Sequence, residues 1–302
     1  MHAPTLDQVR VLIAVSEAGS FSQAARRLNR AQSAVTHAVQ KLERDTGLAL
    51  FDRSGYRPVL TPAGEALLVR ARRIAEEVDA FREQGRGLAG GLEAELTVAL
   101  DSMCPMPFVV DALRAFSARF PTVPPRVHVR PLGAAARLVM DGTCAIGLLP
   151  EVVTRSTPLR TAPILTVELV PVVAPAHPLA AIAGMVPMAE MDRHVQLVLT
   201  DASDLTAGRD HGVLSSRTWR LADLEAKRSM LLGGLGWGSM PRHMVAEDLA
   251  RGRLRVIRPE GFGRETTTLV IRSAHAADAG PGPAGRWMLD HLQSRSDLTD
   301  DW

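Results

Sequence analysis

A row of short polar side chains recurs along one face of a predicted helix in the N-terminal part of the chain. An amide opens the row, and the next four members stand at positions i, i+3, i+4 and i+7: Gln32, Ser33, Thr36, His37 and Gln40. Such groups donate and accept hydrogen bonds, as the edges of base pairs in the major groove do, and a glutamine can pair bidentately with adenine. The spacing indicates a DNA-reading face, although an isolated helix with this pattern would more often be an ordinary solvated one.

The residues before this row predict the elements that would position it. A first helix has apolar residues at helical spacing and ends at Gly19. Ser20 and Gln23 then form an S-x-x-Q capping box that opens a second helix. Asn29 and Arg30 make a tight turn before the third helix, which runs from about 32 to 46. Two short helices, a turn and a polar third helix together predict a helix-turn-helix.

The segment "LFDRSGYRPVLTPAG" follows the third helix and predicts a short two-stranded wing. Arg53 and Arg57 flank the turn at 54–55, where guanidinium groups would contact phosphates or the minor groove. Thr61 is a favourable N-cap and Pro62 a favourable first residue for the next helix.

The N-terminal residues resemble the LysR-type transcriptional regulators. The matching segments are colinear over about the first 65 residues: "GSFSQAARRL", "QSAVTHAVQKLE", "GLALFDR" and "LTPAG". The resemblance implies a winged helix-turn-helix at 1–61, double-stranded operator DNA as a partner, and RNA polymerase as a partner if the protein is an activator. The chain departs from the family at Ala31, where Ser or Thr usually caps the third helix. Losing that oxygen should cost about 1 kcal/mol of helix stability.

A long amphipathic helix is predicted at 62–90. Apolar residues form a heptad seam, spaced four and three apart: Leu67, Ala71, Ile74, Val78 and Phe81. Such a narrow edge favours a coiled dimerisation arm, and the alternative is a helix packed on its own domain. The resemblance implies the same arm, in a homodimer or homotetramer.

Strands and helices alternate after Gly91, which argues for parallel α/β sheets in one domain or two. The resemblance implies a regulatory domain at 91–302 with two lobes like those of periplasmic solute-binding proteins. Lobe 1 is expected at about 92–163 and 268–302, and lobe 2 at about 164–267. The strands crossing between them should lie near 163–167 and 266–268. The expected fold class is α/β, with the winged helix-turn-helix and the long linker helix at its N-terminal side.

In such a domain small molecules bind where strands end and helix N-termini point into the cleft. Each residue at these places could equally be a cap or a core residue. The predicted effector is small and apolar or aromatic, and the resemblance implies that Ser102 and Thr200 touch it. The candidate effector-binding residues are Ser102, Met103, Cys104, Leu132, Gly133, Thr200, Asp201, Trp219, Trp237 and Met240.

Catalytic and cofactor motifs are missing from the sequence, which argues against an enzyme. "GGLGWG" fails the G-x-G-x-x-G pattern at Ser239, and G-x-S-x-G and H-E-x-x-H do not occur. The nine histidines form no ligand cluster, so we expect no metal and no cofactor. The competing function is a solute-binding protein of the same two-lobed fold. It would need export, and no signal segment is recognisable.

The chain has 302 residues, and 46% of them are hydrophobic. This length and composition fit a globular protein of two or three domains. Net charge is +2; residues 1–60 have eight Arg/Lys against five Asp/Glu, about +3, which leaves about −1 for the rest. No apolar run is long enough to span a membrane, so we expect no membrane partner. Cys104 and Cys144 form no CxxC motif, which fits a cytoplasmic location. They could form a redox pair, but two buried thiols are the more common arrangement.

Overall fold

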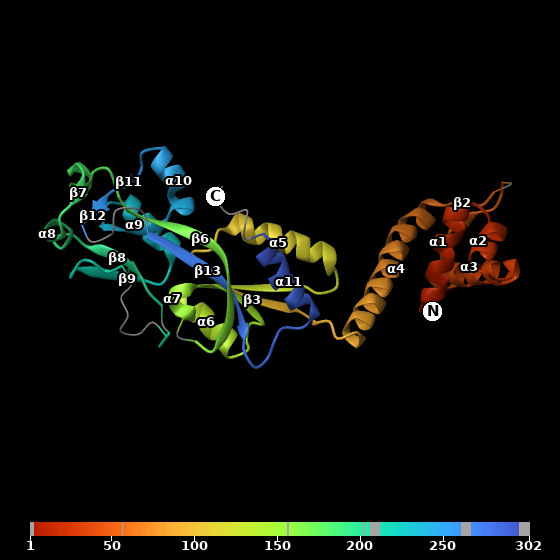
Figure 1. Ribbon diagram of the computed structural model, residues 1–302. Helices are drawn as coiled ribbons and strands as arrows, with labels where there is room; N and C mark the ends of the chain where they lie inside the picture. The colour runs from red at the N-terminus through yellow and green to blue at the C-terminus, as the bar shows by residue number, and fades with distance from the viewer. Residues whose placement is uncertain are drawn as a thin grey trace. The chain divides into compact units, whose positions relative to one another are not determined.

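The computed structural model describes residues 3–55, 57–155, 157–201, 203–205, 212–260 and 267–295. The chain divides into two compact units, Met1–Ala89 and Gly90–Trp302. The first unit is mainly helical, and the second is built on one large sheet (Figure 1).

The first unit is a winged helix-turn-helix extended by a long helix. Its core is one apolar cluster to which the helices and Phe51 contribute. Thr5 and Gln8 form a reciprocal capping box at the first helix, and Gly19 ends that helix with φ 63°. The turn before the third helix uses Asn29 at φ 52°, a conformation that asparagine tolerates better than most residues. The elements are α1 (Leu6–Ala18), α2 (Phe21–Arg27), α3 (Gln32–Thr46), β1 (Phe51–Asp52), β2 (Val59–Leu60) and α4 (Pro62–Ala89).

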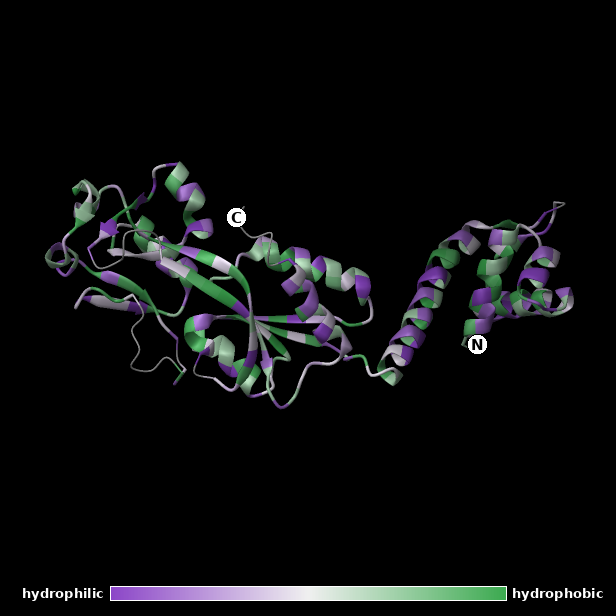
Figure 2. Ribbon diagram, viewed as in Figure 1, coloured by the Kyte–Doolittle hydropathy of each residue, from purple (hydrophilic) through white to green (hydrophobic). Residues whose placement is uncertain are grey.

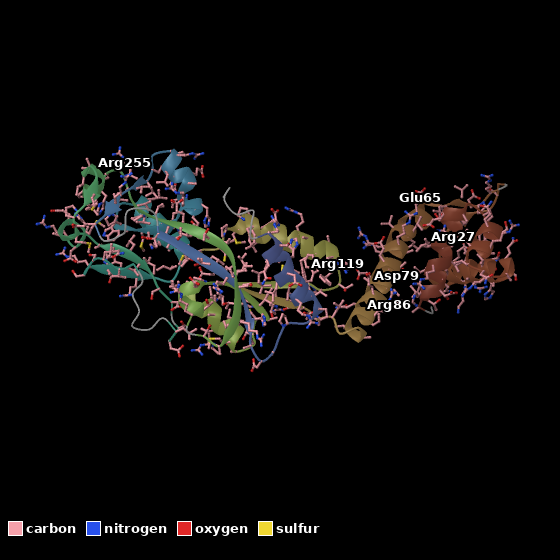
Figure 3. The ribbon with its side chains drawn as sticks, viewed as in Figure 1. Arg27, Glu65, Asp79, Arg86, Arg119 and Arg255 are labelled. Atoms are coloured by element: carbon pink, nitrogen blue, oxygen red, sulfur yellow. The ribbon has the colours of Figure 1, made fainter. Side chains whose placement is uncertain are left out.

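The long helix α4 begins as its sequence predicts. The Thr61 hydroxyl accepts a hydrogen bond from the Gly64 amide and donates one to the Ala49 carbonyl. A Cβ at Gly64 would lie 2.1 Å from the Leu50 carbonyl oxygen, so this close approach to the wing requires glycine. Asp79, labelled on α4 in Figure 3, forms an ion pair of 2.8 Å with Arg10 of α1.

The predicted seam of α4 is divided between two environments. Ala71 is buried in the core of its own unit, and Leu67 packs against that core, so the alternative of a helix packed on its own domain applies to the first turns. Farther along, Ile74 is 48% exposed and Phe81 is 76% exposed. The first part of the seam is therefore not available to a second chain, whereas the later part is.

The second unit has a nine-stranded sheet in which eight strands follow the order β4-β3-β5-β13-β6-β10-β8-β9, with β11 paired to β6. β3 pairs in parallel with β4 and β5, and β8 pairs in parallel with β9 and β10. These strands are β3 (Leu96–Asp101), β4 (Pro125–Arg130), β5 (Ile146–Pro150), β6 (Leu159–Val173), β8 (Gln196–Leu199), β9 (Thr218–Leu221), β10 (Trp237–Pro241), β11 (Arg255–Val256) and β13 (Thr267–Ala276).

Helices cover this sheet, and one short separate strand pair completes the unit. The helices are α5 (Met106–Arg119), α6 (Leu132–Met140), α7 (Glu151–Thr154), η1 (Pro178–Ala181), α8 (Met188–Met191), α9 (Leu224–Leu232), α10 (Arg242–Ala250) and α11 (Pro283–Ser294). The separate pair consists of β7 (Met185–Val186) and β12 (Arg258–Pro259).

Two long antiparallel strands, β6 and β13, join the two halves of the sheet (Figure 1). β13 pairs with β5 on the lobe 1 side, and β6 pairs with β10 on the lobe 2 side. The first expected crossover, at 163–167, lies inside β6, beside an irregularity opposite Ile271 and Arg272. The expected return at 266–268 begins outside the described residues; Thr267 and Thr268 pair with Leu169 and Glu168.

The core of the second unit runs through both lobes. The central strands are largely hydrophobic in Figure 2, and one apolar cluster includes Leu100 of lobe 1, Ile164 of β6 and Met240 of lobe 2. In the described part of the chain, no helix is both long enough and apolar enough to cross a membrane.

Candidate DNA-binding surface and interlobe cleft

The polar row of α3 lies on the side of the helix away from its core. Val35 and Val39 are fully buried, whereas Gln32, Ser33 and His37 are exposed. Gln40 is exposed as well. The fifth member is half-buried, and its hydroxyl donates to the carbonyl of residue 32 at 3.0 Å, so Thr36 has less freedom to bind a base.

The N-terminus of α3 lacks a side-chain cap. Ala31 occupies the N-cap position in an extended conformation and makes no capping hydrogen bond, as its sequence predicts. The first amides of the helix therefore remain free of a side-chain acceptor at that position, and free amides at a helix start favour anions such as phosphates.

The two wing arginines have different surroundings. Arg53 forms an ion pair of 3.0 Å with Glu43 of α3, and its guanidinium stacks over the Phe21 ring, 5.1 Å from the centroid. Arg57 is exposed and has no ion pair within the described part of the chain. Arg57 is therefore the freer of the two to meet a phosphate, and Arg53 also holds the wing in place.

Glu43 is a positioning residue that sequence reasoning missed. One oxygen of its carboxylate accepts hydrogen bonds from the amides of Leu50 and Phe51, at 2.9 and 3.2 Å, while the other pairs with Arg53. This carboxylate fixes the angle between α3 and the wing. The glutamate at the end of "QKLE" gives no periodicity signal for this role, because its partners lie in a loop and a strand.

In the second unit, Ser102 follows β3 at the edge where a cleft was predicted. Its backbone amide donates to the Arg130 carbonyl at 3.3 Å. Its hydroxyl is shielded from solvent and has no hydrogen-bond partner among the described residues. A buried hydroxyl without a partner costs about 1–3 kcal/mol, so a ligand or ordered water is expected to satisfy it.

The start of α6 brings several of the predicted residues together. Its N-cap position is Pro131, which offers no side-chain oxygen. The Leu132 amide instead donates to Asp101 of β3 at 2.6 Å, and the Ala134 amide donates to Asp201 of lobe 2 at 2.7 Å. Two carboxylates of the chain thus cap one helix, and the second of them joins the lobes.

Gly133 is pressed against lobe 2 at the same place. A Cβ on this residue would lie 2.1 Å from the Ser203 hydroxyl and 3.0 Å from a carboxylate oxygen of Asp201. Leu132, directly before it, has φ 48°, an uncommon conformation for a branched side chain. Gly133 and Asp201 therefore meet each other in this structure.

Burial changes the acidity of Asp101. The residue is 1% exposed, and desolvation raises its pKa to about 6, with a further upward contribution from the charge of Asp201. Hydrogen bonds from the amides of Met103 and Leu132 act in the opposite direction. Asp101 was not among the sequence-predicted residues; its place at the end of β3 is the signal that could have found it.

Several of the predicted effector residues are buried in the core in this structure, so their main role here is packing. Trp237 is fully buried against Val173 and Leu179, and Met240 is fully buried in the cluster shared by the lobes. Met103 is 8% and Cys104 is 4% exposed, so both mainly pack. Alternation along β10 places these large apolar side chains beneath helices, which the sequence alone could not distinguish from cleft walls.

Both cysteines are free and buried. Burial raises the pKa of the Cys104 thiol and raises that of Cys144 to about 11. Protonated thiols are poor nucleophiles, so the surroundings are those of structural cysteines and not of an activated redox pair.

Thr200 and Trp219 retain accessible surface in lobe 2. Thr200 follows β8 and is partly exposed; its amide donates to the Leu221 carbonyl at 2.8 Å. Trp219 lies in β9, the last strand of the sheet, and is 48% exposed. Both are therefore open to a ligand, whereas Ser102 is a candidate because its shielded hydroxyl has no hydrogen-bond partner among the described residues.

A separate pocket lies in lobe 1 beside α11, away from the predicted site. Its volume is about 380 Å³, and Arg160, His275 and Arg286 are among its lining residues. None of the predicted effector residues lines it. Among the described residues, no group of three or more His, Cys, Asp or Glu side chains could hold a metal ion.

Comparisons with known proteins identify the family of both parts of the chain. Residues 6–65 match the family described as "Bacterial regulatory helix-turn-helix protein, lysR family", and residues 89–297 match the "LysR substrate binding domain". The chain belongs to the LysR family of DNA-binding transcriptional regulators, whose members are not enzymes.

Relatives of similar length support this assignment. The chain is 32% identical over 300 residues to the probable HTH-type transcriptional regulator YhaJ of Escherichia coli (strain K12), covering 96% of each chain. It is 28% identical over 297 residues to the HTH-type transcriptional regulator AceR of Acinetobacter baumannii, again covering 96% of each.

Solved structures show the same fold. A mutant of OxyR (C206) from Corynebacterium glutamicum has a TM-score of 0.51 and 21% identity, covering 98% of this chain and 94% of that one. CrgA, a LysR-type regulator from Neisseria meningitidis, has a TM-score of 0.50 and 21% identity, covering 98% and 99%.

Proposed function

We propose that this regulator reads its operator with the exposed face of α3 and contacts phosphates with the wing. The supporting observation is the row of Gln32, Ser33, His37 and Gln40, all exposed on a helix whose opposite side is buried. Arg57 supplies a cation without an ion pair among the described residues, and Thr36 and Arg53 contribute to a smaller extent.

The protein acts as a homodimer formed through α4. Ile74 and Phe81 are exposed apolar residues seven positions apart, the spacing of one heptad. A second copy of the same helix is the occupant that this pattern fits. Two recognition helices related by a two-fold axis then meet half-sites about 10 base pairs apart, or a multiple of that. A tetramer would form through the second units.

An effector binds between the lobes of the second unit and changes operator affinity. Ser102 supports this site because its hydroxyl lacks a partner among the described residues, and Thr200 and Trp219 are accessible in lobe 2. Such a ligand acts only through its different affinities for the two arrangements of the lobes. The site of action is the cytoplasm, with RNA polymerase as a further partner if the protein activates transcription.

A mobility-shift titration with the DNA upstream of the protein's own coding region tests operator reading. Gln32→Ala should weaken binding by about 1–3 kcal/mol and relax the preference at one base position. Gln84→Ala is a matched control, since Gln84 is exposed on α4 and outside the proposed surface. Equal affinities for the wild type and Gln32→Ala would remove α3 as the reading helix.

A further inference from the structure

Lys227 is a buried lysine in the first turns of α9, on the side of that helix that packs on the sheet. It is 4% exposed, while its helix neighbours Leu224 and Leu231 belong to the apolar core. Space for its stem comes from Gly238 of β10, where a Cβ would lie 3.1 Å from the lysine Cε. Its Nζ donates a hydrogen bond of 2.7 Å to the Ser239 carbonyl.

No acidic partner balances this ammonium in the described part of the chain, and the carbonyl is a neutral acceptor. The acidic side chains of the surrounding elements are already engaged. Asp223 caps α9 by accepting from the Ala226 amide. The ion pairs on α9, α10 and β6 are Arg228–Glu225, Arg228–Asp248, Arg253–Asp248 and Arg242–Glu168.

An unpaired ammonium is an expensive group to bury. Desolvation lowers its pKa to about 8, so the amine is still mainly charged near neutral pH. A lysine has three donors, and the structure provides one acceptor for them among the described residues. An apolar side chain of similar volume would pack here at no electrostatic cost. A negative group that binds beside Nζ would remove this cost.

Lys227 lies at the ligand-binding edge of lobe 2. β8 and β10 run parallel, so they end at the same edge of the sheet, where Thr200 follows β8. α9 starts at this edge, two residues after β9 ends. Side chains on a helix lean toward its N-terminus, and the Lys227 Nζ accordingly lies beside the carbonyl of Ser239, two residues before β10 ends.

In lobe 1, the N-terminus of α6 is already occupied by two carboxylates of the chain. The start of α6 would be the natural place for a ligand carboxylate, but Asp101 and Asp201 of the chain occupy it. A further negative group there would meet two carboxylates. The start of α6 is therefore closed to an anionic effector, whereas the start of α5 has no side-chain cap and Lys227 provides a full positive charge in lobe 2.

We propose that Lys227 is the counter-ion for an anionic group, a carboxylate, on the effector that binds between the lobes. The proposal rests on the effector site proposed above and adds the chemical class of the ligand. The apolar part of the ligand would lie toward Trp219, and the carboxylate would lie beside Nζ of lobe 2.

The chain makes a direct test simple because it contains only two lysines, Lys41 and Lys227. Full-length protein with carbon-13-labelled lysine gives two side-chain resonances, and Lys41, exposed on α3, is an internal control. The probes are monocarboxylates from acetate to benzoate, their amides from acetamide to benzamide, and inorganic phosphate, each at up to tens of millimolar. Carboxylates should shift the Lys227 resonance and raise its titration midpoint, whereas the amides should not.

Lys227→Met tests the charge at nearly constant volume. Removing one partner of a buried charge pair should weaken carboxylate binding at least about 30-fold. Binding of the amides should be unchanged, and Lys41→Met should bind carboxylates like the wild type. Affinity for carboxylates should also fall above pH 8, because the free amine loses its proton there.

The possible failures are distinguishable. If no carboxylate moves the Lys227 resonance, or if Lys227→Met binds carboxylates as tightly as the wild type, the counter-ion assignment is wrong. A response to phosphate alone would replace the carboxylate with a phosphate group and overturn the stated class. The wider effector proposal is tested separately with Ser102→Trp. It fails if the small molecules that bind the wild type, whether carboxylates or neutral compounds, bind Ser102→Trp with the same affinity.

Discussion

The Asp201 carboxylate of lobe 2 accepts a hydrogen bond of 2.7 Å from the backbone amide of Ala134, at the start of α6 in lobe 1. Ser203 donates to the same carboxylate oxygen at 3.1 Å, which fixes its orientation. A charged acceptor at a helix N-terminus is favourable, and here it also links two lobes. The contact defines a closed arrangement that an effector would have to keep or break.

Replacing Asp201 by alanine should loosen this closure. Hydrogen bonds to charged groups contribute about 1.5–3 kcal/mol, so amide exchange at 132–134 should speed up by about tenfold or more. Glu225→Ala is the matched control, because Glu225 is exposed and pairs with Arg228 on the same helix of lobe 2, so its loss leaves the contacts between the lobes intact. Hydrogen exchange with mass spectrometry measures both variants. Unchanged protection at 132–134 in Asp201→Ala would show that the contact does not hold the lobes.

Gly133→Ala should separate the lobes by steric contact instead of by charge. The new methyl group would approach the Ser203 hydroxyl and the Cβ of Leu205, the latter at 3.0 Å. Overpacking of this kind typically costs about 1–3 kcal/mol. Gly85→Ala in α4 is the control, since no atom lies within 4 Å of its added Cβ and a helix interior favours alanine. Thermal unfolding and amide hydrogen exchange at 132–134 measure the effect. Wild-type values of both in Gly133→Ala would contradict the close packing of Gly133 against lobe 2.

The sequence predicted the elements of the first unit well because its signals are local. Helical periodicity, the Gly19 end, the Ser20 N-cap and the Thr61 N-cap each depend on residues close in the chain. It predicted the interlobe contacts poorly. Asp101 and Asp201 meet α6 through strands that are distant in sequence, and no spacing rule connects them.

The same limit applies to the apolar residues. Trp237 and Met240 lie on opposite sides of β10 and are both fully buried, each as a member of a different apolar cluster. From sequence, a large apolar residue at a strand end can be a cleft wall or a core residue. Only the helices that cover each face decide between the two. Lys227 was overlooked for a related reason, because a charged residue in a helix is normally solvated.

Alanine substitutions of the two wing arginines, Arg53 and Arg57, should have different effects. Arg57→Ala should leave thermal stability unchanged and lower the salt dependence of operator binding by about one ion. Arg53→Ala should lower both the thermal stability and the salt dependence of operator binding. Its ion pair with Glu43 and its stacking on Phe21 are lost, which should lower the free energy of unfolding by about 1 kcal/mol. Thermal unfolding and salt titrations of affinity measure these effects. Identical behaviour of the two variants would contradict the different surroundings described above.

Asp101 should make stability depend on pH in a known direction. Its folded-state pKa of about 6 exceeds the ordinary value of 3.8, so protonation favours the native state. The stability gained from this proton is complete below pH 3.8 and is lost as the pH rises through 6, about 3 kcal/mol in all. Asp101→Asn lacks this titration, so the stability of the wild type relative to the variant should fall between pH 4 and pH 7. Urea unfolding measures the difference, and a constant difference across this range would contradict the assignment.

Ile74→Asp should weaken the dimer without unfolding the chain. Ile74 is 48% exposed on α4, so an aspartate there meets solvent in the single chain and keeps the fold intact. In a coiled pair the same position is buried, and an unpaired carboxylate in an apolar seam costs several kcal/mol. The dimer dissociation constant should therefore rise by about a hundredfold or more. Gln84→Asp introduces the same charge at an exposed polar position of α4 and should have a smaller effect. Light scattering and sedimentation measure the oligomeric state, with circular dichroism as the check on folding. A monomeric wild type at micromolar concentration, or a fully dimeric Ile74→Asp, would mean that the exposed turns of α4 are not the dimer interface.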